Sequence, residues 1–308
     1  MALWLQWCEA MWLQELYLIW IDDRLGVEVE EKNKDIASDG DANECSVTMT
    51  TDINFFFAKC PPFQNTTVNI IQFKFGAIDF ISALSTFLHN TFWTTIPPSI
   101  HDQFDVYKQL GINLPQNSYL SEHKQTDRIR TLPSVKANGR SPEIPAHFDT
   151  AIIIEDPQLY KSDGGLAGEF LFHWVCFKTF IYLFLGLHIA QVHLIFDLPQ
   201  HLGTLPHPLV YIKWFTPLGR PDASTGLYSI THSTHQTCRN STVVSINRIL
   251  WGCHLIARFP WVVPSSWTAN NILEQASLQY FFNPYIDVDT FSLFKYSYFQ
   301  WLQTFHSN

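Results

Sequence analysis

Short runs of β-branched and aromatic residues recur along the last third of the chain, and turn residues separate them. Pro, Gly, Asn and Asp punctuate this region at short intervals, as they do between the strands of all-β domains. The runs predict strands at residues 189–196, 209–215, 227–231, 243–246 and 285–291. Successive short strands with tight turns are typical of a small barrel or sandwich. We therefore expect residues 189–308 to form a β-rich domain built on an SH3-like barrel.

Helical spacing of apolar residues appears in four other places. Leu5, Trp12, Leu16 and Ile19 predict an amphipathic helix over residues 1–21. The same spacing predicts helices at residues 76–89, 267–280 and, as a terminal aromatic helix, 294–305. Residues 53–160 mix helical signals with many prolines, and we expect an irregular α/β region there. The predicted fold class is α+β, with an N-terminal helix, an irregular middle region and a C-terminal barrel.

Charge divides the chain unevenly. The net charge is −9, and nine acids against three bases fall between residues 22 and 45. Residues 22–52 are therefore expected to form an acidic linker. Only 15% of all residues are charged, whereas about 25% is usual in a soluble domain. The acidic balance argues against a protein that coats nucleic acid, because neutralising phosphates needs a surplus of Lys and Arg.

Residues 161–188 form an apolar insert between the middle region and the predicted barrel. Residues 170–187 contain only two strongly polar side chains, His173 and Lys178, and reach the lower length limit of a transmembrane helix. No basic cluster flanks the insert, as one would flank a membrane span on its cytoplasmic side. Three interpretations stay open: an intron translated in frame, a membrane anchor and a buried helix.

Long motifs give the chain a resemblance to a known family. These motifs include Pro208–Pro217 (PLVYIKWFTP), Gly226–Ile230, Val243–Ile249 and Phe281–Asp287, with Phe56–Pro62, Arg128–Pro133 and Pro145–Thr150 upstream. Together they resemble the C-terminal part of Plavaka-type transposase-derived proteins of basidiomycete fungi, over most of residues 53–291. Such transposases resemble RNase-H-like enzymes, whose catalytic core would lie upstream. The resemblance implies a catalytically inactive segment of a transposon-derived nuclear protein.

The last third also resembles the BAH module, a β-barrel that binds histone tails and chromatin proteins. This likeness covers only residues 205–291 and implies a chromatin-binding or peptide-binding role. An aromatic cage for a methylated lysine could then be lined by Tyr211, Trp214, Phe215, Tyr228 and Trp267. The competing interpretation places these same side chains in the core of the barrel.

One basic cluster stands out in the middle region. Its members, all between residues 115 and 145, are Lys124, Arg128, Arg130, Lys136 and Arg140. It is either an ordinary solvated face or a local contact for phosphate or for an acidic tail, and a contact with nucleic acid would be confined to it.

Several short motifs contain the residue types of metal-binding or catalytic sites. His147 and Asp149 have the H-x-D spacing of an Fe(II)-dependent oxygenase, with His254 and Arg258 as further candidates. His232, His235, Cys238 and Cys253 offer zinc ligand types without the usual paired spacing. Six scattered cysteines without a C-x-x-C pair indicate reduced thiols. We expect a non-enzymatic nuclear protein without cofactor or metal; the alternatives are the oxygenase and a single-pass protein anchored in a membrane through residues 170–187.

Overall fold

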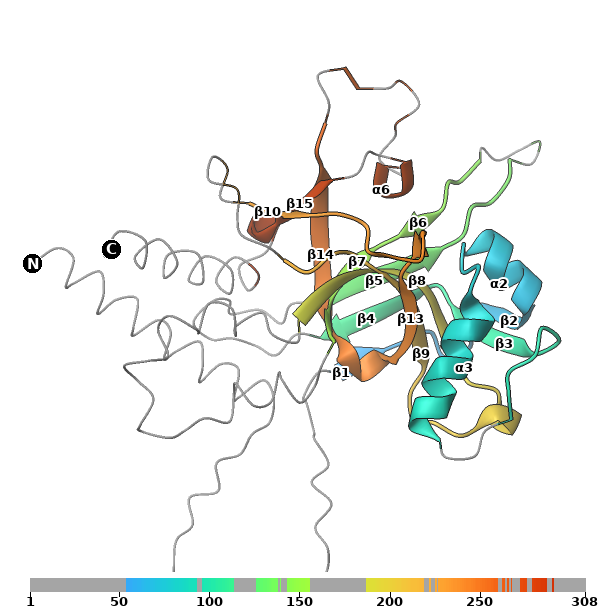
Figure 1. Ribbon diagram of the computed structural model, residues 1–308. Coiled ribbons are helices and arrows are strands. Elements are labelled where there is room, and N and C mark those ends of the chain that lie inside the picture. Colours follow the sequence, from blue (N-terminus) through green and yellow to red (C-terminus); the bar gives the residue numbers. More distant parts are fainter. Residues whose placement is uncertain are drawn as a thin grey trace, which may run out of the picture. The chain divides into compact units, whose positions relative to one another are not determined.

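The computed structural model describes residues 54–92, 96–113, 126–137, 143–155, 187–218, 227–259, 272–275 and 279–286, with a few single residues between these ranges. The chain divides into two compact units, residues 1–54 with 113–125 and residues 55–112 with 126–308. Nearly all described residues belong to the second unit, which is an α+β structure made mainly of β-sheet (Figure 1).

Strand β8 (Leu187–Asp197) is the centre of the larger sheet. Its first ten residues are all buried. On one edge it pairs with β7 (Thr150–Ile154) along its first half and with β3 (Gln103–Tyr107) near its end, and on the other edge it pairs with β9 (Leu209–Trp214). A strand covered on both faces can be apolar at every position, which explains the nearly continuous apolar run of β8.

The other strands of this nine-stranded sheet extend outward from β8. Its order is β10-β15-β14-β7-β8-β3-β2, and β13 joins through β9. These strands are β10 (Tyr228–Ile230), β15 (Tyr280–Asn283), β14 (Ile249–Ala257), β2 (Phe63–Thr67) and β13 (Ser241–Ser245). The end of β9 meets the segment after β10 through one isolated bridge, Phe215 to His232. Regular pairing stops there, so the described strands form no closed barrel, in contrast to the expected SH3-like barrel.

A second sheet has the order β1-β4-β5-β6. Its strands are β1 (Asn54–Phe56), β4 (Gln109–Asn113), β5 (Thr126–Leu132) and β6 (His147–Phe148). Only Lys108 separates β3 from β4, and only Asp149 separates β6 from β7. The chain therefore passes directly from one sheet to the other at two corners. A small hairpin, β11 (Thr234–His235) with β12 (Cys238–Arg239), forms a two-stranded sheet of its own.

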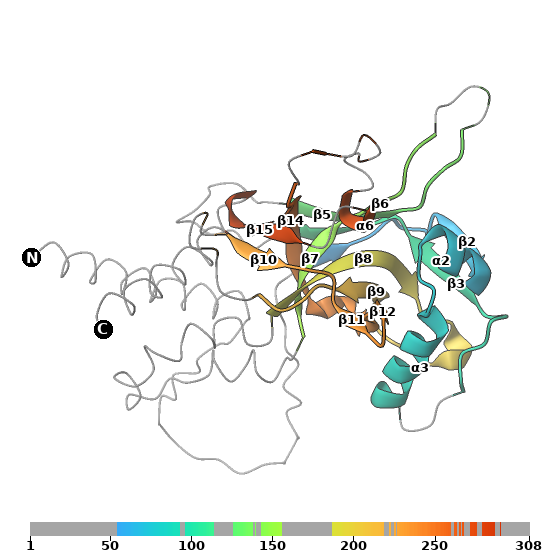
Figure 2. The same cartoon turned by 45° about the horizontal axis from the view of Figure 1, so that its top comes forward.

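Two helices cover one face of the larger sheet (Figure 2). They are α2 (Val68–Lys74) and α3 (Phe80–Thr91). In α3 the fully buried residues Phe80, Leu84 and Leu88 repeat every fourth position, so they form one stripe toward the sheet. The Phe80 ring packs edge-on against Phe104 and Phe196, with centroids 5.0 and 5.1 Å apart. Short helical turns are η1 (Gln200–Leu202), η2 (Ile246–Arg248), η3 (Pro284–Ile286) and α6 (Ile272–Gln275).

The structure confirms the predicted strands at 189–196, 209–215, 227–231 and 243–246 to within a few residues, and the helix predicted at 76–89 is α3. The closing strand predicted at 285–291 is wrong, because the last described strand is β15 and the turn η3 follows it. The middle region is not irregular, since it supplies seven strands. Residues 1–53 and 291–308 lie outside the described residues.

Two further expectations change. Strand β8 begins at Leu187, so residues 187 and 188 belong to the sheet and not to the apolar insert, whose residues 161–186 lie outside the described part. On β9, side chains that alternate along the strand would be expected to give one core face and one exposed face. Instead five of its six residues are buried and Lys213 is half-buried, so both faces of the strand are covered. Leu209 and Tyr211 share a hydrophobic core with Phe80, Leu84 and Leu88 of α3.

Candidate functional site

The five aromatic candidates do not form a surface cage. Tyr211, Phe215 and Tyr228 are buried almost completely, and Trp214 is 5% exposed. The Tyr211 hydroxyl donates to Asp79 Oδ1 at 2.5 Å, and the Trp214 indole N–H donates to Thr242 Oγ1 at 2.9 Å. Trp267 is half-buried, with its ring 6.3 Å from that of Phe259. Four of the five side chains therefore serve as core.

Trp214 stacks on a buried histidine at the start of β8. The His188 and Trp214 rings lie 4.9 Å apart at an interplanar angle of 26°. His188 Nδ1 is 2.9 Å from Glu155 Oε2, which follows β7. These contacts lie at the described end of the β7–β8 pair, beside Ile154 and Leu187.

The basic cluster is only partly available to a partner. Lys124 and Arg140 lie outside the described residues. Arg130 is held by Asp149, whose Oδ2 accepts from the Arg130 backbone N–H at 2.8 Å and from Nε at 3.0 Å. Arg128 and Lys136 are exposed, and the described residues offer their side chains no partner. Within the described part of the chain, the Arg128 and Lys136 side chains are therefore available to an external charge.

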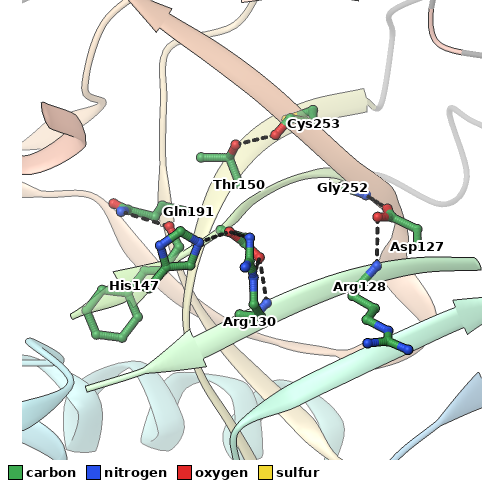
Figure 3. A network of polar contacts seen from close by, with 10 residues as sticks. Asp127, Arg128, Arg130, His147, Thr150, Gln191, Gly252 and Cys253 are labelled. Atoms are coloured by element: carbon green, nitrogen blue, oxygen red, sulfur yellow. Dashed lines mark hydrogen bonds and ion pairs between the residues drawn. The ribbon is translucent and has the colours of Figure 1, made fainter. Parts of the chain in front are cut away.

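The H-x-D pair is also engaged within the fold. His147 Nε2 lies 2.7 Å from Asp149 Oδ1, while Arg130 occupies Oδ2 (Figure 3). His254 is an exposed residue of β14, and its Nδ1 is 3.3 Å from the Asn283 amide. Within the part of the chain that the structure describes, no three His, Cys, Asp or Glu side chains gather in a way that could hold a metal ion. Asp149 acts here as the anchor of a corner between β6 and β7.

A second aspartate joins the two sheets. Asp127 of β5 accepts from the backbone N–H of Gly252 on β14, and from the Arg128 N–H at 2.7 Å (Figure 3). A Cβ at Gly252 would lie 2.9 Å from Asp127 Oδ2. Glycine thus allows the carboxylate to approach the strand backbone. Nearby, Thr150 Oγ1 donates to the Cys253 carbonyl at 2.7 Å.

The zinc candidates do not converge. His232 Nε2 is 2.9 Å from the Leu273 carbonyl, and its ring packs on Tyr280 at 5.2 Å. His235 and Cys238 face each other across the exposed β11–β12 hairpin. The spacing of three residues places them in a turn, away from the half-buried Cys253 on β14.

Sequence reasoning missed a polar cluster between the helices and the sheet. Asp79 precedes α3 and accepts from the hydroxyls of Tyr211 on β9 and Ser241 on β13. Burial, reinforced by Asp79, raises the pKa of Tyr211 above its usual range. The signal available in the sequence was one aspartate at the start of an amphipathic helix and polar residues in apolar strands.

His193 of β8 lies beside this cluster. It is buried, and its Nδ1 is 2.7 Å from the Phe75 carbonyl. Burial, followed by the positive charge of Lys213, holds the pKa of His193 well below its usual value. A neutral imidazole that donates Nδ1–H to Phe75 fixes the end of α2 to the sheet.

Comparisons with protein families, curated proteins and solved structures find no match. Among the described residues, no helix is long and apolar enough to cross a membrane.

Proposed function

We propose that the chain is a non-catalytic binding segment of a transposon-derived nuclear protein. The motif resemblance supports the transposon origin and the nuclear location. The observation that supports the non-catalytic role is the environment of Asp149. Its Oδ2 contacts Arg130 and its Oδ1 contacts His147, both residues of the same fold. A carboxylate held in this way stabilises a sheet corner and does not offer an open metal site.

A cobalt titration tests this role against the oxygenase alternative. Co²⁺ replaces Fe²⁺ in H-x-D sites and gives visible absorption bands when protein ligands bind it. We expect no absorption that depends on Asp149, and we expect Asp149→Asn to lower the melting temperature through loss of the Arg130 contact. A Co²⁺ spectrum that disappears in both His147→Ala and Asp149→Asn would overturn the proposal.

The contact surface of this segment is the basic part of the β5–β6 hairpin. Beyond β5 and β6 the chain continues as a two-stranded arm, residues 133–137 and 143–146, that projects from the sheets in both views (Figures 1 and 2). Lys136 lies on this arm, and Arg128 lies on β5, toward the end of the strand that is away from the arm. Their free positive charges suit an acidic protein segment, whereas a basic histone tail would be repelled.

Fluorescence anisotropy of a labelled peptide with alternating Val and Glu residues tests this surface. We expect binding that weakens with salt and is reduced by Lys136→Glu and by Arg128→Glu. Lys74→Glu, on the exposed side of α2, is the matched control and should leave binding unchanged. Binding of a short DNA duplex in place of the acidic peptide would show that the cluster contacts phosphate. An equal loss of peptide binding in all three variants would show nonspecific electrostatic attraction.

A further inference from the structure

The exposed hairpin of β11 and β12 carries two side chains of the kinds that bind metal ions. The two strands pair in antiparallel register, so that His235 lies directly opposite Cys238 (Figure 2). Both residues are exposed. Residues directly opposite each other in an antiparallel pair place their side chains on the same face, with Cβ atoms about 4.5 to 5.5 Å apart. The imidazole and the thiol are therefore neighbours on one face of the hairpin.

The base of this hairpin is fixed to the larger sheet. Ser233 N–H donates to the Trp214 carbonyl at 3.0 Å, and Trp214 N–H donates to the Asn240 carbonyl at 2.9 Å. Asn240 N–H donates in turn to the Ser233 carbonyl at 2.9 Å. Because Trp214 is a buried residue of β9, these three bonds hold the hairpin in a defined position.

The neighbouring cation belongs to the other face of the hairpin. Arg239 follows Cys238, and side chains alternate along a strand, so the two side chains point to opposite faces. The Arg239 guanidinium lies over the Phe215 ring, 5.5 Å from its centroid. The arginine charge is thus directed toward the sheet and away from the face that carries the thiol.

The turn of the hairpin has an unfavourable backbone for its sequence. Gln236 and Thr237 both have positive φ, at 48° and 69°. A two-residue turn of type I′ requires this conformation and favours Asn-Gly, whereas a β-branched threonine adopts it rarely. Strained backbone that a fold retains is found most often at functional sites. Here the strained turn is what brings the residues before and after it, His235 and Cys238, to one face.

A neighbouring imidazole and thiolate are suited to bind one zinc ion, but they fill only half of its coordination shell. Structural zinc takes four ligands in a tetrahedron, with His nitrogen at about 2.0 to 2.1 Å and Cys sulfur at about 2.3 Å. Within the described part of the chain, no group of three His, Cys, Asp or Glu side chains could hold a metal ion. A second copy of the chain would supply an identical pair, and two thiolates would balance the charge of Zn²⁺.

We propose that His235 and Cys238 form half of a zinc site, which two copies of the chain complete as a His₂Cys₂ centre. Each copy brings its exposed hairpin to a two-fold axis through the metal, so the same patch is used on both chains. Each thiol loses its proton when it binds the ion, so zinc affinity falls as the pH is lowered. This inference goes beyond the proposed binding role of the arm and does not depend on it.

Analytical ultracentrifugation of the full chain under reducing conditions tests the shared site. Addition of one Zn²⁺ per two chains should double the mass of the zinc-free protein, and EDTA should reverse the change. Cys238→Ser and His235→Asn should each abolish this doubling. Cys60→Ser removes another exposed thiol and is the matched control, which should dimerise as the unaltered chain does. A dimer that persists in EDTA, or one that forms equally in Cys238→Ser, would overturn the inference.

Cobalt absorption provides a second readout, because thiolate ligands give Co²⁺ a charge-transfer band. We expect this band to saturate at one Co²⁺ per two chains and to be lost in Cys238→Ser. Thr237→Gly relieves the strained turn without removing a ligand, and should keep the band. Saturation at one Co²⁺ per chain without dimerisation, or no thiolate band, would overturn the inference. Neither outcome involves Asp149 or Lys136, so the proposed function is tested separately.

Discussion

Strand β8 and the arm beyond β5 and β6 are both extended chain, yet their surroundings are opposite. Ten successive residues of β8 are buried between neighbours on both edges and layers on both faces. The arm has one partner strand and leaves Val135 and Ile144 half-exposed. An isolated two-stranded hairpin is only marginally stable in water. The core of the protein therefore depends on β8 and its neighbours, while the arm adds mainly exposed surface.

The largest effect should come from a substitution in the core around β8. Trp214→Ala removes a buried indole that stacks on His188 and hydrogen-bonds to Thr242. Deleting a buried aromatic usually costs about 3 to 5 kcal/mol, and we expect a loss of this size in urea unfolding. Trp267→Ala, at a half-buried position, should cost clearly less. Equal losses at the two positions would show that Trp214 is not part of a tightly packed core.

Tyr211→Phe should have the next largest effect. The variant leaves Asp79 without its buried hydroxyl donor, and a hydrogen bond to a charged group contributes about 1.5 to 3 kcal/mol. Urea unfolding should show a loss in this range, whereas Tyr285→Phe on an exposed ring should show a smaller loss. If Tyr211→Phe leaves stability unchanged, the Asp79 cluster does not hold α3 to the sheet.

Replacement of residues 156–185 by Asn-Gly tests whether the β7–β8 pair folds without them. Ile154 and Leu187 are cross-strand partners, so Glu155 and Gly186 can be joined by a two-residue turn. Shortening the connection lowers the entropy cost of closure by about 2 kcal/mol. We expect cooperative thermal unfolding at an equal or higher temperature. Loss of cooperative unfolding would mean that these residues are an essential structural element.

Stability should depend on pH through His193. Its pKa in the folded protein lies below the usual value, so the unfolded chain binds the proton more readily. The free energy of unfolding should therefore be highest above pH of about 6.5 and should fall below it by about 1.4 kcal/mol per pH unit. Urea titrations at several pH values measure this slope. His193→Gln should reduce it, and His207→Gln, at an exposed site, should not.

The smallest effect should appear on the arm. Val135→Ser changes a half-exposed side chain, and surface substitutions usually stay within about 0.5 kcal/mol. Ile129→Ser, on the fully buried side of β5, is the contrasting variant and should destabilise strongly. Differential scanning calorimetry of the two variants measures the contrast. A large loss from Val135→Ser would place the arm in the folded core.

The local sequence pattern was sufficient to predict those strands and helices whose apolar positions alone indicate that they are buried. The run from 189 to 196 is apolar at nearly every position, and it forms β8. The stripe of Phe80, Leu84 and Leu88 repeats at helical spacing, and it forms the buried side of α3. The middle region was not predicted because its strands are short and partly polar. In addition, β3 and β7 pair with β8, which lies far along the chain.

The candidate site shows the same division. The sequence by itself determined which residue types are present: the H-x-D pair, the aromatic run around Trp214 and the basic residues near Arg128. Only the tertiary structure decided their roles. It placed Arg130 on Asp149, covered both faces of β9 and brought Asp79 to Tyr211 across more than a hundred residues. Burial and long-range pairing are properties of the whole packed chain, since each side chain's environment is supplied by segments that its own local sequence does not encode.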